Sequence, residues 1–228
     1  GKTVSEMENI ERLDQGAQGH VYRAWHRPTK REVAIKILLN GPASSMEQRR
    51  RFQQEVELAA RLRHPNIVSI YDSGEASGYS FIVMEYIPGL RIDDYVCVEQ
   101  LSVQQIASLF CIICDAVHFA HQNAVLHRDL KPSNLLVNAD GKPHVLDFGL
   151  AKDIEPNREH SIISLTGQVV GTLPYLSPDQ VRGEPSSIQT DVYALGVILF
   201  ELLTGEYPYP IDDNRYQSLS NIVTRDPM

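Results

Sequence analysis

Two polar segments in the second half of the chain contain residue types that proton transfer and metal binding require. The first is His127-Arg128-Asp129-Leu130-Lys131-Pro132-Ser133-Asn134, and the second is Asp147-Phe148-Gly149, with a strand-like run at 135–137 between them. Asp129 is suited to accept a hydroxyl proton, and Asn134 and Asp147 are suited to hold Mg²⁺. Each residue alone could be a turn former, but the set at these offsets indicates a catalytic site.

A lysine inside an apolar strand is a second candidate. Residues 33–38 read Val-Ala-Ile-Lys-Ile-Leu, and period-two alternation places Lys36 on the same face as Ala34. A lysine among apolar neighbours needs an anionic partner or ligand. Glu55 lies on the apolar stripe of the next helical segment. We therefore predict a bridge between Lys36 and Glu55 that holds the lysine toward phosphates.

A glycine-bearing segment between two predicted strands is a third candidate. Its glycines would let backbone N–H groups approach phosphate oxygens closely. Taken alone, the segment is more often an ordinary hairpin turn. Its residues are Leu13, Asp14, Gln15, Gly16, Ala17, Gln18, Gly19, His20 and Val21.

Composition limits the classes of protein and partner. The chain has 228 residues with 43% hydrophobic and 22% charged residues, which is typical of globular proteins. Its net charge of −8 argues against a nucleic-acid partner. The most apolar stretch, 192–203, is too short to span a bilayer, so we expect no membrane contact from this part of the chain. Three cysteines favour a reducing, cytoplasmic location, and an anchor elsewhere in a longer protein stays open.

Periodicity predicts a sheet-rich first part and a helical second part. A capping box of Ser44 and Glu47 predicts a helix that ends near residue 63, before Pro65. The predicted strands are 10–13, 21–25, 33–38, 67–71 and 81–86. The other predicted helices are 103–123 and 190–204, and the apolar composition of the latter indicates burial on all sides. A hinge at 85–89 would leave a cleft between the two parts, where ligands commonly bind.

Two further groups are weaker candidates for a metal site. Cys111 and Cys114 lie three residues apart, without a second pair, which favours core cysteines over a zinc site. His118 and His121 lie three residues apart on the same predicted helix without a companion carboxylate that would complete a metal site, so we expect them to be surface or packing residues.

Together the segments resemble the protein kinase family over almost the whole chain, from about residue 10 to residue 228. The resemblance continues through Gly171-Thr172-Leu173-Pro174-Tyr175, Ser177-Pro178-Asp179 and Asp191-Val192-Tyr193. Lys131 and Thr172 are typical of the Ser/Thr branch of the family. The Leu-Ser-Pro sequence at 176–178 is similar to that of bacterial eukaryotic-like kinases. The resemblance implies an α+β, bilobal fold in one kinase domain over 1–228. Its small antiparallel-sheet lobe with one helix covers about 1–86, its hinge 85–89, and its larger helical lobe about 90–228, with further C-terminal helices of the family missing.

The resemblance also implies a nucleotide pocket for ATP. Val21 and Ala34 would roof the adenine and Leu136 would floor it. Backbone groups of Glu85 and Ile87 would bind its edge, and Met84 would guard a back pocket. Two positions depart from the family: Asp14 replaces the first glycine of the loop, and Arg91 stands near where many relatives offer an acid to the ribose.

The implied activity is ATP- and Mg²⁺-dependent phosphorylation of protein Ser/Thr hydroxyls, with Lys36, Glu55, Asp129 and Lys131 as catalytic residues. The alternatives are a pseudokinase that serves as a binding or scaffold module, and a kinase-like small-molecule phosphotransferase. The implied partners are protein substrates, with self-association for autophosphorylation in trans. Regulation would come from a phosphate that pairs with Arg128. Ser164 and Thr166 are the preferred acceptors, and Thr172 is expected to contact Asp129 and Lys131.

Overall fold

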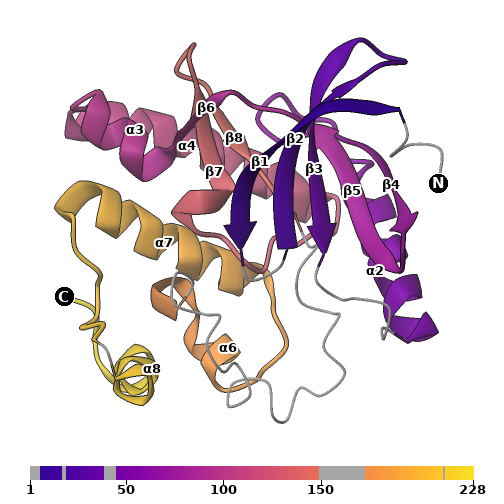
Figure 1. Ribbon diagram of the computed structural model, residues 1–228. Helices are drawn as coiled ribbons and strands as arrows, with labels where there is room; N and C mark the ends of the chain where they lie inside the picture. The colour runs from indigo at the N-terminus through magenta and orange to yellow at the C-terminus, as the bar shows by residue number, and fades with distance from the viewer. Residues whose placement is uncertain (1–5, 17–18, 39–44, 149–172, 213) are drawn as a thin grey trace.

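The computed structural model describes residues 6–16, 19–38, 45–148, 173–212 and 214–228 (Figure 1). A five-stranded antiparallel sheet forms the first part of the molecule, and helices dominate the second part (Figure 1). The architecture is therefore α+β, as predicted. The first sheet has the order β1-β2-β3-β5-β4. Its strands are β1 (Met7–Gly16), β2 (Gly19–His26), β3 (Arg31–Leu38), β4 (Ile70–Ala76) and β5 (Tyr79–Glu85).

Both faces of this sheet carry apolar side chains at its centre. Val33 and Ile35 of β3 belong to one buried cluster, whereas Ala34 and Leu38 belong to the main core. This alternation is the period of two that the sequence predicts for a strand. The main-core face of β3 is also the face of Lys36, so the lysine is directed toward the centre of the molecule.

Helix α2 (Met46–Ala59) packs on the main-core face of the sheet through buried Phe52, Val56 and Ala59. It ends four residues before the predicted end near residue 63. Ser44 lies outside the described residues, and Glu47 forms an ion pair with Arg51 one turn later.

The predicted strand 67–71 is displaced along the chain. Ile67 instead makes a parallel bridge to Val145, and the N–H of Val68 donates to the Val145 carbonyl at 3.0 Å. Ile67 and Val68 therefore connect the first part of the molecule to Val145 of the second part through backbone hydrogen bonds, and β4 begins only at Ile70.

The second part begins with a small sheet that carries the polar segments. Strands β6 (Gly89–Arg91), β7 (Leu135–Asn138) and β8 (Pro143–Val145) are antiparallel neighbours in that order. The helical elements are α3 (Ile92–Val98), α4 (Val103–Gln122), η1 (Pro132–Asn134), η2 (Leu173–Tyr175), α6 (Pro178–Val181), α7 (Ile188–Thr204) and α8 (Arg215–Thr224).

Helix α4 matches its prediction to within one residue because both its start and its apolar stripe are encoded locally. Ser102 and Gln105 form a capping box at its beginning. Its buried residues recur three or four positions apart, and include Ile106, Ile113 and Val117. The helix is long and apolar enough to cross a membrane, but its apolar stripe lies in the protein core. Cys111 on its outer side is exposed and Cys114 is half-buried, so Cys111 is not a core cysteine.

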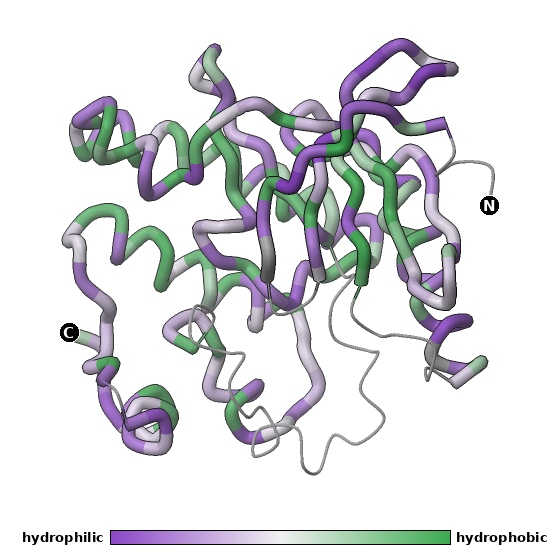
Figure 2. The backbone as a smooth tube through the Cα atoms, viewed as in Figure 1, coloured by the Kyte–Doolittle hydropathy of each residue, from purple (hydrophilic) through white to green (hydrophobic). Residues whose placement is uncertain are grey.

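Helix α7 is mostly apolar (Figure 2), with polar residues such as Asp191 and Glu201 among the apolar ones. The prediction that it is buried on all sides is wrong, because Val192 is 56% exposed and Leu203 is 42% exposed. One side of the helix, with Ala194 and Ile198, packs in the main core. The described residues leave the opposite side in contact with solvent.

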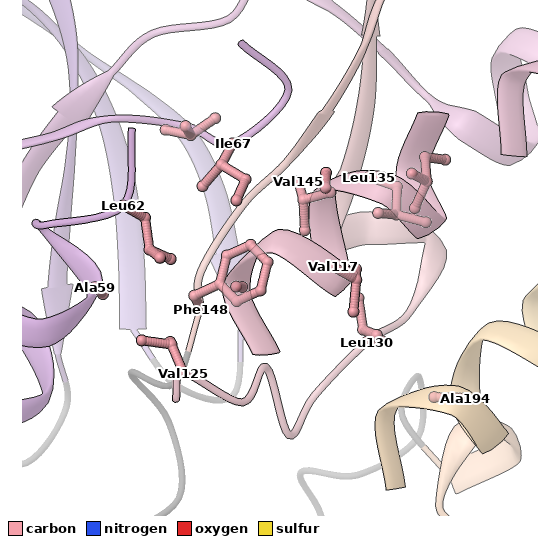
Figure 3. Close-up of a cluster of buried hydrophobic side chains, with 14 of the residues drawn as sticks. Ala59, Leu62, Ile67, Val117, Val125, Leu130, Leu135, Val145, Phe148 and Ala194 are labelled. Carbon is pink, nitrogen blue, oxygen red and sulfur yellow. The ribbon is translucent and has the colours of Figure 1, made fainter. Parts of the chain in front are cut away.

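One continuous core connects the two parts. Phe148 lies among Leu62 and Ile67 of the first part and Val117 and Val125 of the second (Figure 3). Phe148 is 3% exposed. Because such interiors pack at the density of organic crystals, this core sets the relative position of β3, α2 and the polar segments.

Candidate active site

The segment 127–131 lies between α4 and η1 in the chain, and a side chain from the beginning of α7 holds its backbone. The Asp191 carboxylate, in the first turn of α7, is 1% exposed. It accepts the backbone N–H groups of His127 at 2.8 Å and Arg128 at 2.7 Å. Charge-assisted bonds of this kind are about twice as strong as neutral ones, so Asp191 fixes the start of the loop.

The same carboxylate has a third donor that the sequence analysis missed. Nε2 of His121, from the last turn of α4, lies 2.8 Å from Asp191 Oδ2. The expectation that His121 lacks a carboxylate companion is therefore wrong. The partner stands 70 residues away in the chain. The only local signal was an aspartate at the head of an apolar helix.

His127 connects the loop to Leu146, the residue directly before Asp147. Its Nε2 donates to the Leu146 carbonyl at 2.7 Å, and its Nδ1 accepts the backbone N–H of Asp129 at 3.3 Å. Complete burial lowers the pKa of His127 and keeps the ring neutral, as this donor and acceptor pattern requires. The backbones next to the carboxylates of Asp129 and Asp147 are therefore held by one side chain.

The structure brings the predicted base and its neighbours together. The Asp129 carboxylate is buried, and its Oδ2 lies 3.0 Å from Nζ of Lys131. The Asn134 side chain donates its amide N–H to the Asp129 carbonyl at 2.8 Å. The oxygen of this amide is therefore the Asn134 atom suited to a metal ion.

Lys36 and the second carboxylate form a buried ion pair. Nζ of Lys36 lies 2.7 Å from Oδ2 of Asp147, and the lysine is 4% exposed. Oδ1 of Asp147 is also buried but has no hydrogen-bond partner among the described residues. Asn134 lies next to this position because its backbone carbonyl accepts the N–H of Leu146 at 2.9 Å. The orphaned carboxylate oxygen of Asp147, on a segment that is hydrogen-bonded through its backbone to Asn134, fits the predicted Mg²⁺ site.

Glu55 pairs with a different cation from the predicted one. Its Oε1 lies 2.6 Å from an Arg128 guanidinium nitrogen, and both side chains are mostly buried. The predicted bridge from Lys36 to Glu55 is therefore replaced by two pairs, Lys36 with Asp147 and Glu55 with Arg128. The physical reason is that Arg128, with its left-handed backbone (φ +69°), brings a second cation to α2 from the catalytic loop.

The residues predicted to enclose an adenine ring occur together in the main core. Ala34, Met84 and Ile87 are buried there, and Val21 and Leu136 pack against the same cluster. The backbone N–H of Glu85 already donates to the Ser69 carbonyl at 2.9 Å. An adenine ring at Glu85 would therefore have to contact its carbonyl oxygen rather than its N–H.

The glycine-bearing segment forms the end of the β1–β2 hairpin, where Gly16 pairs with Gly19 and Gln15 with His20. Ala17 and Gln18 lie outside the described residues. A Cβ at Gly19 would lie 2.1 Å from the Ile37 carbonyl oxygen, so only glycine fits beside β3. The side chains of Leu13 and Asp14 are exposed. The predicted phosphate contact of this segment stays a prediction.

Two remaining predictions concern the phosphorylation sites and the position near the ribose. Ser164, Thr166 and Thr172 lie outside the described residues, so their regulatory role stays a prediction. Arg91, expected near the ribose, forms an exposed ion pair with Asp93 at 2.7 Å.

Comparison with known proteins agrees with this geometry. The family model for the protein kinase domain matches residues 7–226. The chain is 41% identical over 211 residues to serine/threonine-protein kinase PrkC of Bacillus subtilis (strain 168), covering 92% of this chain and 32% of PrkC. It is 37% identical over 221 residues to serine/threonine-protein kinase PknB of Mycobacterium leprae (strain TN), covering 95% of this chain and 35% of PknB. The chain thus spans about a third of the length of these relatives. It belongs to the protein kinase domain family.

Proposed function

We propose that the protein is an ATP- and Mg²⁺-dependent protein serine/threonine kinase. The observation that carries this proposal is the convergence of Asp129, Asn134, Asp147 and Lys36 between the two parts of the molecule. The names of PrkC and PknB, both serine/threonine-protein kinases, support the same acceptor class. All three roles usually lost in a pseudokinase, the lysine, the base and the metal ligand, are present in the chain.

The proposed reaction transfers the γ-phosphoryl group of ATP to a hydroxyl oxygen of the substrate. The oxygen of a substrate Ser or Thr hydroxyl bonds to the γ-phosphorus, the bond from that phosphorus to the β–γ bridging oxygen breaks, and ADP leaves. Asp129 orients the hydroxyl and accepts its proton. Lys131, 3.0 Å from Asp129, supplies positive charge beside the phosphoryl group in transfer.

The metal would be held by Asp147 Oδ1 and the Asn134 amide oxygen. When bound, Mg²⁺ offsets the negative charge that develops on the phosphates. Such a site needs few protein ligands because Mg²⁺ is usually completed by phosphates and water. Lys36, already held beside Asp147, is positioned to contact the phosphates as a further cation.

Regulation by phosphorylation is the finer part of the proposal. Arg128 already pairs with Glu55, so a phosphate on Ser164 or Thr166 would compete for or share its guanidinium. Replacing both acceptors by alanine should lower activity toward an added protein about tenfold. If the phosphorylation rate is unchanged in this double variant and also in Arg128→Ala, this regulation is excluded.

We also propose a cytoplasmic location for the domain and self-association for autophosphorylation in trans.

The function is tested by incubating the protein with Mg²⁺ and ATP labelled at the γ-phosphate. Casein-like protein and small alcohols serve as alternative acceptors, and phosphosites are mapped by mass spectrometry. We expect label on protein Ser and Thr, and none with Asp129→Asn. Nucleotide binding without transfer would identify a pseudokinase, whereas label only on the alcohols would identify a small-molecule phosphotransferase.

A further inference from the structure

The peptide bond between Arg128 and Asp129 is held at both of its polar atoms. The amide nitrogen Nε2 of Gln180 donates to the Arg128 carbonyl at 3.0 Å. On the other side of the same peptide, the Asp129 N–H donates to His127 Nδ1 at 3.3 Å. Because a peptide unit is planar, these two bonds fix the orientation of the backbone that carries the Asp129 side chain.

The preceding peptide is fixed independently. The Arg128 N–H donates to Asp191 Oδ1 at 2.7 Å. Arg128 between the two planes has a φ of +69°, in the left-handed region that non-glycine residues rarely occupy. Such a backbone persists only where its surroundings hold it, so each of these bonds contributes to keeping Asp129 in place.

Gln180 makes this contact from a different part of the fold. It lies in α6, which begins after Ser177, and its Oε1 accepts the Ser177 N–H at 3.1 Å. Because the amide oxygen accepts there, the amide nitrogen is the atom directed at the Arg128 carbonyl. One side chain thus spans from the beginning of α6 to the catalytic loop, and it lines the same small cavity as Asp129.

We propose that Gln180 is a positioning residue for the catalytic loop. Its amide holds the peptide unit before Asp129 and thereby the direction of that carboxylate toward a substrate hydroxyl. The role rests on the proposed kinase activity. It also makes the position of Asp129 depend on the segment from η2 to α6, whose Ser177 backbone orients the Gln180 amide.

A purely local role for Gln180 is the competing explanation. Gln180 and Ser177 form a capping box, in which the Gln180 N–H also donates to Ser177 Oγ at 3.2 Å. Two substitutions separate the roles. Gln180→Glu keeps an oxygen for the Ser177 N–H but turns a second oxygen toward the Arg128 carbonyl. Ser177→Ala removes the hydroxyl of the box but keeps the Gln180 amide.

The first measurement is steady-state phosphorylation of a protein substrate. We expect Gln180→Glu to lower kcat about tenfold or more while the KM for ATP stays within about twofold, because the loss concerns Asp129 and not the nucleotide pocket. Gln180→Met, which is uncharged and of similar length, should show the same split and guards against misfolding of the glutamate variant. Ser177→Ala should keep kcat within about twofold of the parent, with a lower Tm.

The second measurement is amide hydrogen exchange over residues 127–131, which needs no catalysis. We expect faster exchange in both Gln180 variants and unchanged exchange in Ser177→Ala. Parent-like kcat and exchange in the Gln180 variants, or an equal loss of kcat in Ser177→Ala, would overturn the proposal. If the parent protein transfers no phosphate, the kinase assignment fails, and the exchange comparison still decides whether Gln180 holds the loop.

Discussion

At the scale of single residues, the site depends on charges that are buried and paired. Lys36 and Asp147 share an ion pair in which both side chains are largely shielded from water. Removing one partner of such a pair leaves the other charge desolvated, which costs more than the pair itself contributes. Substitutions here therefore change stability as well as chemistry, and each test needs a measurement of folding.

Asp129→Asn and Asp147→Asn should each remove nearly all phosphoryl transfer. The asparagine at 129 cannot accept the hydroxyl proton, whereas the asparagine at 147 loses the charge that holds the metal and pairs with Lys36. The kcat is measured with protein substrate, and circular dichroism checks the fold. Near-parental turnover in either variant would contradict the assigned role.

Lys36→Met should reduce catalysis more than nucleotide binding. The apolar pocket and the backbone contacts at the hinge remain, but the cation beside the phosphates is lost. Comparing kcat with the Kd for ATP tests this expectation. An unchanged kcat would show that Lys36 is only structural.

His127 should make the protein less stable in mild acid. Burial lowers its pKa in the folded state, so the unfolded chain takes up the proton first as the pH falls through about 6.5, the usual pKa of histidine. The free energy of unfolding should therefore fall as the pH is lowered from 7.5 to 5.5, by at most about 1.4 kcal/mol per pH unit from this residue.

Urea denaturation of the parent and His127→Gln at both pH values measures the effect. Glutamine keeps a donor for the Leu146 carbonyl but does not titrate, so it should flatten the pH dependence. Burial also lowers the pKa of His144, which leaves a smaller slope in the variant. Equal slopes in the two proteins would exclude His127 as a source.

At the scale of elements, the pair of Glu55 and Arg128 joins α2 to the catalytic loop. These residues stand 73 positions apart in the chain and come from the two parts of the molecule. Because α2 carries Glu55 on its core-facing side, its placement on the sheet and the conformation of the loop are coupled through one ion pair.

A double-mutant cycle with Glu55→Gln and Arg128→Gln should give a coupling energy of about 1 kcal/mol in urea denaturation, since the pair is partly buried and charge-assisted. Glu57→Gln is the matched control, because Glu57 is exposed on the same helix. We expect no coupling between Glu57 and Arg128. Zero coupling for Glu55 as well would show that the observed pair contributes nothing to stability.

At the scale of the whole molecule, α7 has one side on which large apolar side chains are exposed. Ile188, Val192 and Leu203 lie on the described part of this surface. Contiguous exposed apolar area is unusual in monomeric proteins and favours association. Figure 2 shows the same helix as one of the most apolar elements of the chain.

If residues after Met228 in a longer version of the chain cover this side of α7, that version should be more stable than residues 1–228. Burial of these side chains contributes about 25 cal/mol for each Å² removed from water. The Tm and the tendency to aggregate are compared between the two versions. Equal Tm values would show that later residues do not cover α7.

Several elements could be predicted because their information is local. The alternation of β3, the capping box and stripe of α4, and the sequence of polar residues from His127 to Asn134 all occur within short windows. These patterns indicate the α+β class and identify the carboxylates, the amide and the lysine of the site. Chemistry that depends on residue type and spacing is readable from the chain alone.

The pairing of the charges was decided by the tertiary structure. Glu55 forms its ion pair with Arg128 in place of Lys36, and His121 pairs with Asp191. Gln180 donates a hydrogen bond to the Arg128 carbonyl. Each contact joins elements more than fifty positions apart, and each depends on packing geometry that no local pattern encodes. Electrostatic partners are chosen by distance in space, and a single sequence specifies which residues are charged but not which of them come within reach.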